Sequence, residues 1–460
     1  MKKRIDFFLK CLLLVGILSW TSCSKDKDFT NLPDNQLSAD DQPFNANLKA
    51  GNTSGIIMQG FYWNVTAGGT WWGTVQGKVS SWASAGITAV WLPPCCKCQS
   101  GNQSVGYDPY DYFDFGNFNQ MGTTETRYGS KTELTSLISA AHSAGLKVYA
   151  DIVINHNAGG SLQANPNTGG NTYTSFIVAS GLFNRGYNDF HPSTYEKSDE
   201  GTFGSYPDLC HVSPYVSGWL WSNSNSVAKT YKSMGYDGWR FDYVKGFHPS
   251  VVKSWISSAG GFGVGECWDG NVSVVQSFVS ASGVSAFDFP CLYAMQTAFT
   301  GGNLAALSTS AMLCKSNPSK AVTFVTNHDE NYITSNKLLA YAFILTHEGT
   351  PCIFYTDYES ELNKTKLNNL IWINKNLAAG TTTVLYADND EYIAKMSGSP
   401  GLVVYINTSS SSLSRSVTTN WTSATIKDYT GNVTTTAITS SSKTVTISAP
   451  AKSYSVWSTQ

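Results

Sequence analysis

Short apolar segments alternate with helical segments along most of the chain. From residue 55 onward, eight runs rich in β-branched residues are almost continuously hydrophobic, which is typical of parallel strands covered on both faces. These predicted strands cover residues 56–62, 87–92, 147–154, 238–244, 263–267, 284–289, 321–326 and 351–355. Because helical segments separate them, the pattern predicts an α/β fold of the (β/α)8 TIM-barrel type.

One of the helical segments shows its boundaries clearly. Ser130 and Glu133 have the spacing of a capping box at a helix N-terminus. Apolar residues then recur at helical spacing through 134–141, and Gly145 supplies a C-terminal stop. We expect a helix here that covers one face of the barrel.

Two parts of the chain depart from the strand–helix repeat. A long segment rich in Gly, Asn, Tyr and Pro, residues 156–211, follows the third strand. Inserts of this length inside a barrel are usually functional, so we expect an inserted loop-rich subdomain. Residues 381–460 alternate apolar and polar positions between Ser/Thr turns, which predicts a C-terminal antiparallel β-domain. The barrel itself is then expected over 53–155 and 212–380.

The N-terminal segment has the pattern of an export signal. A basic start is followed by an apolar run over 11–20, which at about ten residues is too short to span a bilayer. The pattern predicts a lipoprotein signal over 1–22, with Cys23 as the lipidated residue and 23–52 as a flexible tether. An ordinary signal peptide is the alternative. We expect an exported protein, anchored to a bacterial membrane through this lipid alone, at the outer membrane or cell surface.

Composition narrows the class of protein. The 460 residues are 42% hydrophobic and 13% charged, with a net charge of −2, which argues against nucleic acid as a partner. Aromatic residues make up 13%, and they could either stack on sugars or fill a large core. Beyond Cys23 there are eight cysteines without the spacing of a disulfide scaffold, and the sequence leaves their pairing open.

Three acidic residues follow three of the predicted strands. Asp242 lies at the end of the fourth strand, Glu266 at the end of the fifth, and Asp329 just after the seventh. The C-terminal ends of barrel strands form the active-site rim, so these carboxyls are expected to meet in one pocket. The alternative is a set of structural ion pairs at the strand ends.

Glycoside cleavage requires two carboxyls in different protonation states. Arg240 is two residues before Asp242, so both side chains project to the same side of the strand. Its fixed charge would keep Asp242 ionised as a nucleophile, whereas neighbouring carboxylates would keep Glu266 protonated as the general acid.

Four segments resemble the signature segments of the α-amylase family of glycoside hydrolases, in that family's order. They are Asp151-Ile-Val-Ile-Asn-His156, Gly238-Trp-Arg-Phe-Asp-Tyr-Val-Lys-Gly246, Gly265-Glu266 and Phe324-Val-Thr-Asn-His-Asp329. The resemblance runs from about residue 55 to the C-terminus and is strongest to the calcium-dependent amylases of archaea and plants.

The resemblance implies a role for each matching residue. Asp242 matches the nucleophile, Glu266 the general acid/base, and Asp329 the third acid, which binds and distorts the sugar. Residues that match those holding the sugar or the leaving group are Tyr107, His156, Arg240, Lys245 and His328. The family retains anomeric configuration, which places the two working carboxyls about 5–5.5 Å apart.

Metal sites are implied as well. The resemblance carries over calcium ligands from side chains and from backbone carbonyls, namely Asn155, Asp199 and Asp208 with the carbonyls of Gly201 and Gly246. The alternative is that these are ordinary turn-forming residues.

Some relatives also hold a zinc ion through two His and a Cys. Here His191 and Cys210 match, while Glu196 stands in place of the second His. Cys95-Cys-Lys-Cys98 has no second Cys/His cluster after it, so a loop near the cleft is favoured there over a zinc knuckle.

The resemblance favours an endo-acting α-amylase that hydrolyses α-1,4 bonds in starch-type glucans, with a monomer as the default expectation. Two alternatives stay open. The same barrel and acids serve maltogenic, pullulan-cleaving and transglycosylating enzymes, whose specificity depends on loop shape. A glycan-binding or sensing protein on an inactive barrel is the other.

Overall fold

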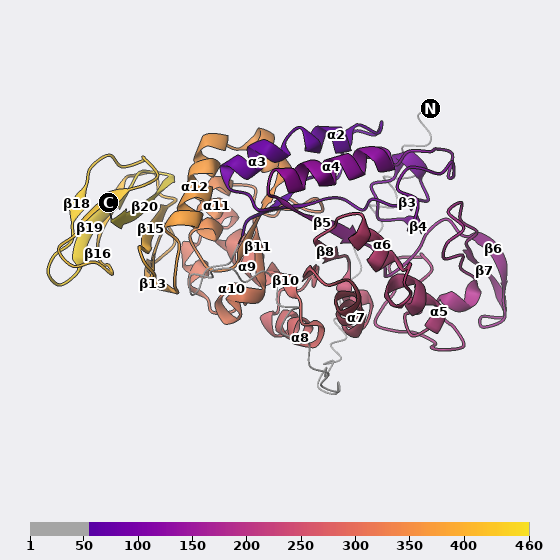
Figure 1. The fold of residues 1–460 in the computed structure, drawn as a ribbon. Helices are drawn as coiled ribbons and strands as arrows, with labels where there is room; N and C mark the ends of the chain where they lie inside the picture. The colour runs from indigo at the N-terminus through magenta and orange to yellow at the C-terminus, as the bar shows by residue number, and fades with distance from the viewer. Residues whose placement is uncertain (1–54, 460) are drawn as a thin grey trace, which may run out of the picture. The chain divides into compact units, whose positions relative to one another are not determined.

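Eight parallel strands close into a barrel, as the hydrophobic runs predict (Figure 1). The computed structural model describes residues 55–459, so the predicted signal, Cys23 and tether lie outside the described residues. Around the barrel the strands follow the order β1, β2, β5, β8, β9, β10, β11, β12 and back to β1. Their bounds are Ile57–Gln59, Ala89–Trp91, Lys147–Ile152, Gly238–Phe241, Phe262–Gly265, Ser285–Phe287, Ala321–Phe324 and Thr350–Phe354. Nearly every residue of these strands is buried, as expected for strands covered on both faces.

Helices follow the strands and cover the outside of the barrel, as α4, α7 and α8 do in Figure 1. The α-helices are α2 Trp71–Gln76, α3 Val79–Ala85, α4 Lys131–Ser143, α5 Pro214–Ser217, α6 Val227–Ser233, α7 Ser250–Ala259, α8 Val272–Ser282, α9 Phe289–Met295, α10 Leu313–Ser316, α11 Lys337–Leu345 and α12 Lys364–Asn376. Short 3-10 or π-helical turns are η2 Gly101–Gln103, η3 Tyr187–Asp189, η4 Gly218–Ser222, η5 Val244–Gly246, η6 Gln296–Thr300, η7 Leu304–Ser308, η8 Pro318–Lys320 and η9 Asp357–Glu361.

The predicted capping box begins α4. The amide of Glu133 donates to Ser130 Oγ at 3.3 Å, and the amide of Ser130 donates to Glu133 Oε2 at 2.8 Å. Gly145, just beyond the helix, has a φ of 83°, which a residue with a Cβ rarely adopts. The expected start and stop of this helix are therefore confirmed.

The insert after the third barrel strand is loop-rich, as predicted. It holds one hairpin, formed by β6 Ser161–Asn165 and β7 Gly170–Ser175, and β3 Lys97–Cys98 pairs with β4 Pro109–Asp111 in the preceding barrel loop. The insert returns to its starting point, because the amide of Leu209 donates to the carbonyl of Asn155 at 2.9 Å. Both ends of the insert thus meet at the carboxyl end of β5.

The C-terminal antiparallel β-domain is also confirmed. Its strands are β13 Thr382–Ala387, β14 Glu391–Met396, β15 Leu402–Asn407, β16 Leu413–Thr418, β17 Thr425–Asp428, β18 Ala437–Ile438, β19 Thr444–Ala449 and β20 Ser453–Thr459. Six of them form one sheet, and β16 pairs with β19. On β15, Val404 belongs to the large core that also fills the barrel, whereas Val403 and Tyr405 belong to a second apolar cluster of the C-terminal domain. This sheet is therefore covered on both faces.

All eight cysteines within residues 55–459 are buried free thiols. Cys98 Sγ lies within hydrogen-bonding distance of the carbonyls of Cys96 and Gly106, and the buried 95–98 segment includes β3, which pairs with β4. In the same part of the chain, no helix is both long and apolar enough to cross a membrane.

Candidate active site

The three predicted acids all follow the carboxyl ends of barrel strands. Asp242 and Glu266 extend the ladder by one residue beyond β8 and β9. The amide of Asp242 donates to the carbonyl of Ile152 at 3.0 Å, and that of Glu266 donates to the carbonyl of Phe241 at 2.9 Å. Asp329 lies in the loop that follows β11. The barrel hydrogen bonds therefore fix the backbone that carries Asp242 and Glu266, whereas a loop positions Asp329.

A buried arginine holds the first two carboxyls together. Arg240 is only 1% exposed, and its Nη1 donates to Asp242 Oδ1 at 2.7 Å and to Asp151 Oδ1 at 2.8 Å. Its Nη2 donates to Glu266 Oε1. As predicted, Arg240 projects to the same side of the strand as Asp242. One guanidinium thus contacts three carboxyls, so that not all of the negative charge around it is balanced.

Glu266 carries the proton in this cluster. Burial raises the pKa of Glu266 to about 8, against the opposing effect of Arg240 and with the help of the charge on Asp242. Burial also raises the pKa of Asp329 to about 6. At neutral pH a protonated carboxyl therefore lies next to Asp242, which is paired with the guanidinium. This is the protonation pattern that glycoside cleavage requires.

Asp151 is a site residue to which the sequence reasoning assigned no role. Besides Arg240, it accepts hydrogen bonds from Tyr107 Oη at 2.9 Å and from Trp91 Nε1 at 3.1 Å. Burial raises its pKa to about 7. Asp151 lies opposite Arg240 in the register between β5 and β8, so both side chains point into the barrel. The sequence feature that could have identified Asp151 is a single acidic residue within an otherwise hydrophobic strand.

Tyr107 and His328 form one hydrogen-bonded wall of the site. Tyr107 Oη lies 2.6 Å from His328 Nε2, and their rings stack at 5.2 Å between centroids. Burial and the nearby charge of Arg240 hold the pKa of His328 well below its usual range. Because the Tyr107 hydroxyl donates to Asp151, the neutral His328 donates from Nε2 and accepts at Nδ1 from Gln59, 2.9 Å away. These two hydrogen bonds thus fix the His328 ring in one tautomer.

The other predicted substrate-binding residues border the same site. His156 is buried, and its Nε2 lies 3.0 Å from the carbonyl of Tyr107. Lys245 is half-exposed at the rim, where its Nζ pairs with Asp269 at 2.8 Å. Trp63 was missed by the sequence reasoning. Its ring is 42% exposed and lies 3° from parallel to that of Tyr107, at 5.7 Å between centroids.

Two of the predicted calcium ligands offer oxygen atoms without partners. Asn155 Oδ1 and Asp208 Oδ1 are both buried and have no hydrogen-bond partner among the described residues. A Cβ built on Gly246 would lie 2.0 Å from Asn155 Oδ1, so the amide is pressed against that backbone. Buried oxygens left unpaired are unfavourable unless something binds them, and a hard cation would.

Asp199 lies near Asp208, and both carboxylates face His191. Its Oδ1 lies 3.9 Å from His191 Nδ1, which is 2.9 Å from Asp208 Oδ2, so the two carboxylates converge on one imidazole. The amide of Gly201 donates to Asp199 Oδ1 at 3.3 Å. The donor set of carboxylates and an amide oxygen fits calcium.

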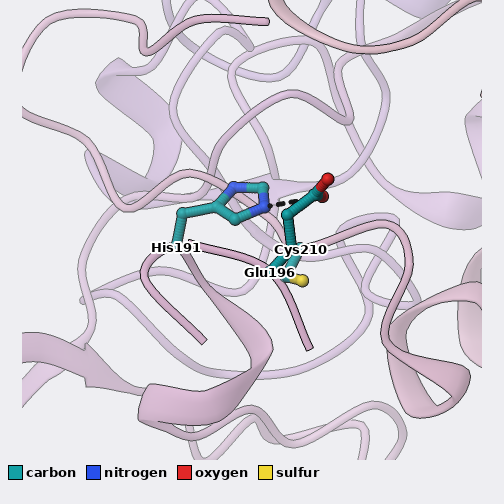
Figure 2. Close-up of side chains that lie close together, drawn as sticks. All are labelled: His191, Glu196 and Cys210. Atoms are coloured by element: carbon teal, nitrogen blue, oxygen red, sulfur yellow. Dashed lines mark hydrogen bonds and ion pairs between the residues drawn. The ribbon is translucent and has the colours of Figure 1, made fainter. Parts of the chain in front are cut away.

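A second cluster lies beside it in the insert (Figure 2). His191, Glu196 and Cys210 each place one ligand atom within 4.8 Å of the others. His191 Nε2 is 3.3 Å from Glu196 Oε2, and Cys210 Sγ is 3.1 Å from Ser193 Oγ. The sequence had suggested these three residues as a zinc site, and the structure brings their side chains together.

Known proteins share both the sequence and the fold. Residues 42–257 match the family described as "Alpha amylase, catalytic domain", and residues 402–458 match "Alpha-amylase C-terminal". An "Alpha-amylase" of Geobacillus stearothermophilus is 31% identical over 71% of this chain and 72% of its own length. The chain belongs to the α-amylase family of glycoside hydrolases.

Other relatives show how broad the family is. A "Glucan 1,4-alpha-maltohexaosidase" of Bacillus sp. (strain 707) is 32% identical over 66% of this chain and 71% of its own length. Among solved structures, an α-amylase from Geobacillus thermoleovorans has a TM-score of 0.69 at 16% identity. It covers 90% of this chain and 99% of its own. At these identities the family and its barrel are shared, whereas the preferred substrate of this amylase-family chain is not fixed.

Proposed function

We propose that this protein is an endo-acting α-amylase that hydrolyses α-1,4 bonds of starch-type and glycogen-type glucans with retention, as a monomer. The observation that carries the proposal is the guanidinium of Arg240, which contacts both Asp242 and Glu266. It stabilises one carboxylate as an anion, while burial keeps the other protonated. Two carboxyls in different protonation states at one centre are what a glycosidase needs, and their contact with one guanidinium fits the short separation of a retaining enzyme.

The reaction proceeds in two balanced steps. Asp242 attacks the anomeric carbon while the bond to the leaving oxygen breaks, and Glu266 gives its proton to that oxygen. The resulting glycosyl ester on Asp242 is then attacked by water, whose proton returns to Glu266. Free sugar of unchanged anomeric configuration leaves, and both carboxyls are restored. Asp329 and the wall of Tyr107 and His328 hold and distort the reacting sugar.

Two assays separate this function from its alternatives. Purified protein should release reducing ends from soluble starch and abolish its iodine colour early, because an endo-acting enzyme shortens long chains first. Maltose as the sole early product, or cleavage of pullulan in preference to amylose, would favour the related enzymes of the family. Binding of amylose without cleavage would support a glycan-binding protein.

We propose that the insert binds calcium through Asn155, Asp199 and Asp208, with the carbonyls of Gly201 and Gly246. The ion would join the insert to the barrel beside the site and balance buried negative charge. The unpartnered oxygens of Asn155 and Asp208 support this proposal. A likeness to the calcium-dependent archaeal and plant amylases fits these residues, and plant amylases of Arabidopsis thaliana are among the relatives.

Calcium removal should destabilise the protein. An ion that binds only the native state contributes about 2.7 kcal/mol at 100 times its Kd, so a chelator is expected to lower Tm by several degrees. Thermal scans with and without chelator measure this shift. Asp208→Asn should abolish most of it, whereas Asp390→Asn, an exposed acid of the C-terminal domain, should keep it. A chelator shift of the same size in Asp208→Asn would contradict the site.

We further propose that zinc binds to His191, Glu196 and Cys210, the cluster of Figure 2. Carboxylate, imidazole and thiolate are all zinc ligands, so these three side chains would supply the protein ligands of the ion. Elemental analysis of the purified protein should then show zinc that is absent from the Cys210→Ser variant.

We also propose that the protein is exported and anchored through lipid on Cys23. The basic start, short apolar run and following cysteine of the sequence support this. Metabolic labelling with a fatty acid should mark the wild type and not Cys23→Ala. Both proteins should still leave the cytoplasm, and a label that persists in Cys23→Ala would contradict the anchor.

A further inference from the structure

Two buried cysteines lie close together in the segment between β10 and β11. Cys291 is in α9 and Cys314 is in α10, and they are 0% and 1% exposed. Their sulfur atoms lie within 4.8 Å of each other. Neither the catalytic steps nor the proposed metal sites use these residues, and the sequence left the pairing of the cysteines open.

A single buried carboxylate holds the backbones of both cysteines. Asp288 Oδ1 accepts hydrogen bonds from the amides of Cys291 at 3.0 Å and of Leu313 at 3.1 Å. Asp288 Oδ2 accepts from the amide of Cys314 at 2.7 Å. Asp288 is the N-cap of α9, so its carboxylate joins the start of α9 to the start of α10. Backbone hydrogen bonds therefore bring the two thiols together.

Asp288, Cys291 and Cys314 also form a group of possible metal ligands, but the carboxylate is already used by three amides. A structural zinc ion takes four ligands, and within residues 55–459 this group offers three. The carboxylate has a structural reason of its own, as the cap of two helices. The chemistry left to the pair is therefore that of two neighbouring thiols.

Burial makes these thiols unreactive in the folded protein. The hydrogen bond with Cys314 acts to lower the pKa of Cys291, but burial outweighs it and the pKa lies above the usual value. The hydrogen bond with Cys291 and burial together raise the pKa of Cys314 well above its usual value. Thiolates, not thiols, exchange with disulfides. The pair is therefore expected to react while the chain folds, before burial, and to be protected from reductants afterwards.

We propose that Cys291 and Cys314 form a disulfide in the exported protein, which links α9 to α10. The oxidant is another disulfide, such as oxidised glutathione. One cysteine thiolate attacks it and releases a thiol, and the second cysteine displaces the other thiol from the mixed disulfide and forms the S–S bond. The cysteines lose two electrons and two protons, and the oxidant takes up both as two thiols. This inference rests on the proposed export, because such oxidants prevail outside the cytoplasm, and not on the proposed catalysis.

Sequential labelling of the thiols tests the pairing directly. The full chain from the cell envelope is unfolded and labelled with iodoacetamide, then reduced and labelled with N-ethylmaleimide. Trypsin should release residues 254–315, which contain Cys267, Cys291 and Cys314. We expect the first label on Cys267, a matched control within the same peptide, and the second label on Cys291 and Cys314. The first label on either Cys291 or Cys314 would overturn the disulfide.

Refolding separates the pairing from export and from catalysis. Wild type refolded with oxidised glutathione should have a Tm about 5 °C above that of wild type refolded with a reductant, because the cross-link restricts the unfolded chain. This gap should vanish in Cys291→Ala and in Cys314→Ala. It should persist in Cys352→Ala, which alters another buried thiol, on β12. A gap that survives in Cys291→Ala, or no gap in the wild type, would overturn the disulfide, while starch hydrolysis by either preparation tests the proposed function separately.

Discussion

Replacing Asp242 with Asn is expected to lower kcat on amylose by about four orders of magnitude or more, while amylose binding persists. A neutral amide cannot form the glycosyl ester, and it removes the anion that faces Arg240 at 2.7 Å. The substitution changes hardly any volume, so the site should keep its shape. Reducing-end assays measure the loss, and migration in amylose-containing gels measures binding.

A carboxylate at the opposite end of the same strand provides the matched control. Asp237 precedes β8 and accepts a hydrogen bond from the amide of Val148 at 2.8 Å, away from the carboxyl ends of the strands. Asp237→Asn should turn over amylose at a rate near that of the wild type. Turnover within tenfold of wild type by Asp242→Asn would contradict the role of Asp242 as nucleophile.

Replacing Glu266 with Gln should lower kcat on amylose by about 10²–10⁴-fold, because no proton reaches the leaving oxygen. Fluoride leaves without protonation, so the first step on α-maltosyl fluoride should be affected far less. Equal losses on both substrates would argue against Glu266 as the acid. Stopped-flow or fluoride-electrode measurements of the first turnover distinguish these outcomes.

The pH dependence of kcat/KM for the wild type follows from the carboxyl of Glu266. Burial raises the pKa of Glu266 to about 8, so the acid form prevails below that pH and is lost above it. The kcat/KM for a glucan reports the free enzyme and should therefore fall as pH rises through about 8. In Glu266→Gln this alkaline limb should disappear. A limb that persists at the same pH in the variant would assign it to another group.

Much of the fold could be predicted because its signals are local in sequence. Strands buried on both faces must be hydrophobic throughout, so each of the eight runs gave a barrel strand. The capping box at Ser130 depends only on residues three positions apart. The acids at strand ends, such as Asp242, were found because barrel geometry brings those ends together.

The rest depended on contacts between distant segments. Asp151 meets Arg240 because the two residues are paired in register on neighbouring strands. No local sequence pattern specifies that register. Trp63 lies on a loop, and its ring orientation results from packing against Tyr107. The motifs had favoured the amylases of archaea and plants, whereas three bacterial relatives match at 31–32% identity and two plant ones at 28–30%.

The most direct test of the account is to capture the covalent intermediate. Glu266→Gln incubated with α-maltosyl fluoride can form the ester but lacks the base that activates water, so the glycosyl-enzyme should accumulate. Intact mass spectrometry should show the addition of one maltosyl unit, and digestion at low pH should place it on Asp242. A label on Asp329 or Asp151, or release of β-maltose without any label, would contradict the account.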